Sequence, residues 1–276
     1  MVRPIGTQLL PSEGTKVPKP FRLAVLSCAK EFAVSCPATV ASSPSQLAQI
    51  PTLLRGEPGP ILLWIGEWRA SRVALYVAVI IAGTATFGWA LGAWRDPLQG
   101  LYTAIKFPLI VLLTALGNGL LNGMLAPLLG TNISFRQSLL AVLMSFTIAA
   151  AVLGACGPLI YFVVWNAPAF SPDAQGPTLM MHNLIFLALV AAMAVAGLAG
   201  NARLFELLRQ LSGQDGAARR TLFAWLAGNL LLGSQLAWIL RPLVGSPSLP
   251  VEFLRANAFD GNFFESTFYH ARHLFP

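Results

Sequence analysis

The chain has 276 residues, of which 55% are hydrophobic and only 11% are charged, and its formal net charge is +7 at pH 7. Soluble domains usually carry about 25% charged residues, so this composition excludes a soluble single-core protein and also a disordered chain. The three cysteines are too few for a disulfide-rich secreted scaffold. We therefore expect an all-α fold, a polytopic membrane helical bundle with amphipathic helices at the membrane interface.

The N-terminal region is rich in Pro, Ser and Gly, and residues 1–60 are expected to form a cytoplasmic, loosely ordered arm. Its first apolar stretch, Leu23 to Cys28, is shorter than the apolar core of a signal peptide. Apolar residues then recur at helical spacing, at Ile61, Leu62, Trp64, Ile65 and Trp68. This spacing predicts an interfacial helix over residues 61–72, with its two tryptophans at the level of the lipid headgroups.

A membrane-spanning helix needs about 20 mostly apolar residues to cross a hydrocarbon core about 30 Å thick. Five uncharged runs reach this length: Val73 to Trp94, Phe107 to Gly130, Ser138 to Trp165, Thr178 to Gly200 and Thr221 to Leu240. They predict a five-span bundle over residues 73–242. The third run contains Gly157-Pro158, and proline removes a backbone donor, so we expect a kink or an early end there. Leucines from Leu204 to Leu211 predict a second interfacial helix, ended by Ser212-Gly213.

The distribution of positive charge predicts the orientation, because Lys and Arg in short flanking segments stay in the cytoplasm. Of the 18 such residues, eight precede the first span, and Arg136, Arg203, Arg209, Arg219 and Arg220 fall on the same predicted side. The other side holds Arg95, Lys106, Arg241, Arg255 and Arg272. We therefore expect a cytoplasmic N-terminus and a C-terminus outside. The net charge is then a topological signal, and no nucleic-acid partner is expected.

No Lys, Arg, Asp or Glu lies within the five runs. Membrane-embedded charges mark proton relays, ion paths and voltage sensors, so we expect none of these functions. The spans instead carry amides and small residues at helix-packing spacing. The residues expected to mediate packing are Asn118, Gly119, Asn122, Gly123, Ala188, Ala192, Ala196, Gly200, Asn229, Gly233 and Gln235. The alternative is a path for water or a polar solute lined by Asn118, Asn122, Asn229 and Gln235.

The sequence contains no zinc-protease helix, nucleophile elbow or phosphate-binding loop, so we expect no enzymatic activity. His270 and His273 supply only two of the three or four ligands that a metal site usually needs, and no metal is expected. His182, at the outer end of the fourth span, is expected to be a structural polar cap beside Asn183. No cofactor is predicted, although bound lipid is expected.

Residues 243–276 are expected to form a Pro-rich segment on the outer face, followed by an aromatic C-terminal helix. Three prolines in nine residues forbid a continuous helix after Arg241. Asn262 and Glu265 have the spacing of a helix-capping pair. Arg241 is expected to pair with Glu252, Asp260 or a lipid phosphate, which would hold the segment across the outer face of the bundle.

The end of the fifth span carries an outer-face motif, made of Trp238, Arg241, Pro242, Gly245, Pro247 and Arg255. Together with Gly233-Ser234-Gln235 and Gly261-Asn262-Phe263-Phe264-Glu265, it resembles the W-x-L-R-P-x-x-G-S-P-x-x-P-x-x-F-x-R segment of uncharacterised bacterial inner-membrane proteins. The resemblance covers roughly the last 50 residues. It implies a bacterial inner (cytoplasmic) membrane, with the C-terminus in the periplasm, and it implies no activity.

Two functions are compatible with these features. The first is a non-enzymatic structural or accessory subunit that packs against other membrane protein subunits of a larger complex in the lipid bilayer. The alternative is a channel or transporter for a neutral small solute or lipid. The uncharged spans, the absence of a catalytic motif and the aromatic-rich segments outside the spans favour the first.

Overall fold

The computed structural model describes residues 46–125, 128–129, 133–168, 170, 176–245 and 249–265. The chain divides into a unit over residues 1–44 and a unit over residues 45–276, and every described residue belongs to the second. The predictions for most of the N-terminal arm, for Pro247, and for His270 and His273 lie outside the described residues.

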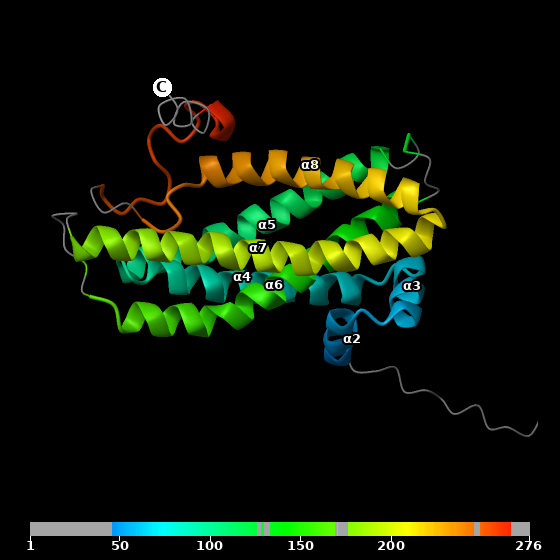
Figure 1. The fold of residues 1–276 in the computed structure, drawn as a ribbon, viewed down its shortest axis with the longest axis horizontal. Helices are drawn as coiled ribbons and strands as arrows, with labels where there is room; N and C mark the ends of the chain where they lie inside the picture. The colour runs from blue at the N-terminus through cyan, green and yellow to red at the C-terminus, as the bar shows by residue number, and fades with distance from the viewer. Residues whose placement is uncertain are drawn as a thin grey trace, which may run out of the picture. The chain divides into compact units, whose positions relative to one another are not determined.

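The described residues form helices and no strands, so the predicted all-α bundle is confirmed (Figure 1). A short 3-10 helix, η1 (Gln46–Ala48), leads into two short helices, α2 (Gln49–Arg55) and α3 (Pro58–Gly66). The five long helices that follow are α4 (Ala70–Gly92), α5 (Pro97–Leu125), α6 (Phe135–Trp165), α7 (Pro177–Ser212) and α8 (Asp215–Ile239). Each of the five is long and apolar enough to cross a membrane, which indicates a multi-pass membrane protein.

The long helices run up and down, because each packs against the next and short connections join them. Helix α6 is central and contacts α4, α5 and α7, whereas α8 packs on α5 and α7 (Figure 1). We call the end of the bundle at which α4, α6 and α8 finish the distal end. The opposite end, where α5 and α7 finish, is the proximal end.

Helices α4 and α6 cross at a pair of glycines, Gly83 and Gly154. A Cβ atom added to Gly83 would lie 2.2 Å from the Ala150 carbonyl oxygen, and one added to Gly154 would lie 2.9 Å from the Gly83 Cα. Small residues at such a crossing let two backbones approach closely. The neighbouring Ile80 and Ala150 are 0% and 1% exposed, so the crossing is packed against the hydrophobic core.

Arg72 joins the two short helices to the proximal end of the bundle. Its guanidinium donates hydrogen bonds to the side-chain oxygen of Gln49 and to the carbonyl oxygens of Trp64 and Glu67, at 3.3, 2.8 and 3.2 Å.

The two short helices differ from the predictions for this part of the chain. Helix α2 lies within the region that was predicted to be loosely ordered. The single helix expected over residues 61–72 is instead split between α3 and α4.

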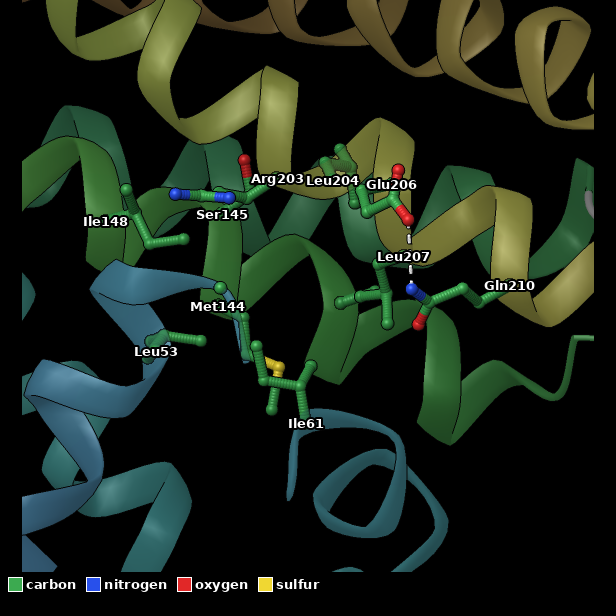
Figure 2. A pocket seen from close by; sticks show the side chains of 12 residues that line it. Leu53, Ile61, Met144, Ser145, Ile148, Arg203, Leu204, Glu206, Leu207 and Gln210 are labelled. Atoms are coloured by element: carbon green, nitrogen blue, oxygen red, sulfur yellow. Dashed lines mark hydrogen bonds between the residues drawn. The ribbon is translucent and has the colours of Figure 1, made fainter. Parts of the chain in front are cut away.

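A small cavity lies among α2, α3, α6 and α7 at the proximal end. Figure 2 shows Ile61, Met144 and Leu207 around it, with the Glu206 carboxylate accepting a hydrogen bond from Gln210 at the rim. Its volume is about 30 Å³, which is room for about two water molecules. The cavity is therefore too small to be a binding site for an organic ligand.

The long helices extend beyond the uncharged runs from which they were predicted. Arg72 lies within α4 and Lys106 within α5, and they are 4% and 0% exposed, although each lies just before the uncharged run of its helix. Helix α6 continues through Pro158 without a break. The helix expected after the fourth span is the last part of α7, which ends at Gly213 in the left-handed conformation (φ 65°).

Candidate functional site

A strip of polar side chains on α5 contacts the backbone of the residues that follow α8. Gln99, Thr103 and Lys106 lie on one face of α5, because residues three and four apart share a face, and all three are fully buried. They donate hydrogen bonds to two carbonyl oxygens. The Lys106 ammonium and the Gln99 amide bond the carbonyl oxygen of Pro242 at 3.1 and 3.2 Å, and the Thr103 hydroxyl bonds that of Leu243 at 2.7 Å.

Arg241 holds the rest of this distal segment, which we define as Leu240 to Glu265. Its guanidinium donates hydrogen bonds to the carbonyl oxygens of Trp238 (2.8 Å), Asn257 (3.1 Å) and Ala258 (3.5 Å). It also stacks on the Trp238 ring at 3.7 Å. The expectation that Arg241 pairs with a carboxylate is therefore corrected, because within the described residues its bonds all go to backbone oxygens.

Glycine is required at Gly245, where the distal segment turns over the end of α5. Its φ of 88° is a conformation that other residues rarely adopt, and an added Cβ would lie 3.0 Å from Cγ of Arg95. Arg95 in turn donates to the Leu249 carbonyl oxygen and stacks on Phe170. At the far end of the segment, the Glu265 backbone amide donates to the Asn262 side chain at 2.8 Å, as the predicted helix cap requires.

A cavity of about 380 Å³, which we call the distal cavity, lies between α7, α8 and the distal segment. Arg241, Arg255 and His182 supply its polar lining, and Phe186 and Leu189 belong to its apolar lining. The Nδ1 atom of His182 is buried and has no hydrogen-bond partner in the described part of the chain. His182 was expected to be a polar cap, and the structure places it in the wall of this cavity.

Positive charge gathers around the distal cavity without a matching carboxylate. Arg255 is half-buried, its side chain makes no hydrogen bond or ion pair with any described residue, and its charge repels both Lys106 and Arg241. Burial, followed by repulsion from Arg255, lowers the pKa of Arg241, and attraction to Asp260 opposes this shift. The ion pairs within the described residues all lie at the proximal end, at Arg55–Glu57, Arg69–Glu67, Arg209–Glu206 and Arg209–Asp215.

The asparagines of the second and fifth spans meet between α5 and α8. The Asn118 amide donates to the Asn229 side-chain oxygen at 2.5 Å and to the Trp225 carbonyl oxygen at 3.3 Å. Asn118 and Asn122 are 0% and 1% exposed, so they are sealed inside the bundle.

The small residues of the spans lie mainly on faces that contact another helix. An added Cβ would meet Leu139 of α6 at Gly119 and Phe135 of α6 at Gly123. On α7, Ala192, Ala196 and Gly200 are buried, and Ala188 is half-buried. Gly233 of α8 lies beside Thr114 of α5, whereas Gln235 is half-buried and its side-chain amide makes no hydrogen bond with a described residue.

The polar strip on α5 was missed by reasoning from the sequence, because Lys106 was taken as the flank of a span. The spacing of Gln99, Thr103 and Lys106, four and then three residues apart, is the signal that could have identified it. No family model, no curated protein and no solved structure matches this chain.

Proposed function

We propose that the protein is a non-enzymatic accessory subunit of a larger membrane assembly and that α8 packs against the partner. The proposed setting is the cytoplasmic membrane of a bacterium, with the N-terminus in the cytoplasm. The partner is another integral membrane protein, which presents a helix with hydrogen-bonding capacity to α8. This interface would lie within the bilayer.

The observation that carries this proposal is the unpaired Gln235 amide on α8. Between Leu226 and Ile239 no residue of α8 is buried by the rest of the chain. A primary amide exposed to hydrocarbon without a hydrogen-bond partner is unfavourable, and amides on membrane helices commonly pair across helix interfaces, where each is worth about 1 kcal/mol. A partner helix would satisfy Gln235 and cover the neighbouring Leu231, which is 57% exposed.

The alternative of a solute path through the asparagines receives less support. Asn118 and Asn229 bond each other, and Asn118 and Asn122 are packed out of reach of solvent. A path for water or a neutral solute needs polar groups that face an open conduit. The asparagine pair therefore fits a contact that fastens α8 to α5.

Position-specific photocrosslinking in native membranes tests the accessory role. A photoreactive residue at Leu231 of α8 should give one adduct of defined mass with a second membrane protein. The same residue at Leu198 of α7, which is 73% exposed, is the matched control and should give adducts with lipid alone. Adducts only with lipid at both positions, or only with a second copy of this chain, would contradict the proposal.

A further inference from the structure

We propose that the distal cavity binds the headgroup of an anionic phospholipid, with the acyl chains lying along α7. This inference is independent of the accessory role, because it concerns the opening between α7 and α8 at the distal end and makes no use of Gln235. The cavity volume of about 380 Å³ falls in the range of about 300 to 1,000 Å³ that is usual for small-molecule sites.

Arg255 supplies hydrogen-bond donors for the headgroup. Its side chain lines the cavity and is half-buried, and no described residue accepts a hydrogen bond from it. A guanidinium presents a planar fork of donors that matches the oxygens of a phosphate. Arg241 lines the same cavity, but its donors are directed to backbone oxygens, so it adds positive charge while holding the distal segment in place.

The charges around the cavity favour an anionic occupant. Arg255 lies close enough to repel both Lys106 and Arg241, and no described carboxylate comes within 4.0 Å of any of the three. Asp260 attracts Arg241 from a greater distance. Like charges in a partly buried site interact strongly because water screens them poorly. An anion in the cavity would replace this repulsion with attraction.

The apolar wall identifies the anion as part of a lipid. Leu189 is buried in the wall, while Phe186 of α7 is 55% exposed and connects the cavity with the apolar outer surface of that helix. Arg241 lies two residues beyond the end of α8, and His182 is the sixth residue of α7. Helix ends of this kind lie near headgroup level, and basic pockets between membrane helices bind anionic headgroups.

Native mass spectrometry of the full-length protein in mild detergent tests this site. The protein is titrated separately with phosphatidylglycerol, which is anionic, with zwitterionic phosphatidylcholine and with inorganic phosphate. We expect phosphatidylglycerol to bind at least about tenfold more tightly than phosphatidylcholine, because the two lipids share the phosphate but phosphatidylcholine also carries a choline cation, which the positive charges of the site repel. Millimolar inorganic phosphate should not displace the lipid, because it makes no use of the apolar wall.

The matched variants are Arg255→Gln in the cavity and Arg220→Gln on the exposed proximal side, each of which removes one positive charge. Arg255→Gln should weaken phosphatidylglycerol binding about tenfold, and Arg220→Gln should leave it unchanged. Equal loss in the two variants would overturn the assignment to Arg255, and displacement by phosphate would reassign the site to a free anion. If Arg255→Gln fails to fold, equal binding of the two lipids by the unmodified protein would itself overturn the proposal.

Discussion

Arg241 is the residue on which the distal segment most depends. The described residues between α8 and the helical residues that begin at Phe263 form no helix or strand, so their backbone oxygens need donors from side chains. Arg241 bonds two of these oxygens, those of Asn257 and Ala258, and it also bonds the Trp238 carbonyl oxygen at the end of α8 and stacks on the Trp238 ring. The polar strip on α5 bonds two more, and together these contacts set the path of the segment over the distal end.

Replacing Arg241 with Ala should therefore loosen the distal segment without unfolding the bundle. Hydrogen bonds that involve a charged group contribute about 1.5 to 3 kcal/mol, so opening of the segment should become easier by about 2 kcal/mol. Limited proteolysis and amide hydrogen exchange between Leu243 and Asp260 would measure the change. Arg220→Ala, on an exposed proximal residue, is the control, and an Arg241→Ala protein as resistant as this control would count against the assigned role.

At the scale of elements, the crossing of α4 and α6 tolerates no side chain at Gly83. An added Cβ there would meet the carbonyl oxygen of Ala150, and that backbone cannot move without shifting α6. Gly197 of α7 offers a matched comparison, because it is also helical but has open space where a Cβ would lie. Replacement of either glycine by alanine changes the helix propensity by the same amount, so a difference in stability between the two variants reports the packing around each position.

Gly83→Ala should lower thermal stability in detergent, since overpacking of a core typically costs about 1 to 3 kcal/mol. Gly197→Ala should leave stability unchanged or raise it by up to about 1 kcal/mol, because alanine favours the helix. A thermal unfolding series on the two variants makes the comparison. Equal stability of Gly83→Ala and Gly197→Ala would show that α4 and α6 do not cross closely at this point.

The sequence predicts the long helices well because a spanning segment must be apolar over a fixed length. It predicts their ends poorly, as Lys106 shows, because a charged residue at the edge of a run can join the helix when another segment covers it. The Gly83–Gly154 crossing was also missed, since neither glycine lies beside the amides that drew attention to other small residues. The path of the distal segment depends on contacts between residues about 140 positions apart, and no local pattern encodes these.

At the scale of the whole molecule, aromatic residues lie near both ends of the bundle. Trp64 and Trp68 lie at the proximal end, and Tyr161 and Trp165 lie near the distal end of α6. Trp and Tyr are enriched where a membrane meets water. These two groups are consistent with a bundle that crosses the bilayer with its proximal and distal ends at opposite surfaces.

The positive charges of the proximal end predict that this end of the bundle faces the cytoplasm. Reporter fusions to truncated chains measure the orientation, because green fluorescent protein fluoresces in the cytoplasm and alkaline phosphatase is active outside it. Green fluorescent protein placed after Gly213 should fluoresce. Alkaline phosphatase placed after Gly261 should be active. The physical reason is the retention of Lys and Arg on the cytoplasmic side. The reverse pattern, with phosphatase active after Gly213, would contradict the predicted topology.

The most direct test of the accessory role is the mass of the particle that contains this chain. The full-length protein is purified from its native membrane in mild detergent, beside Gln235→Leu and a control, Asn183→Leu, which removes an exposed amide from α7. We expect a particle that contains a second membrane protein in fixed proportion. Gln235→Leu should reduce the fraction of the chain found in this particle, and Asn183→Leu should leave that fraction unchanged. A lone chain of 29.5 kDa, or a simple multiple of it, would contradict the account.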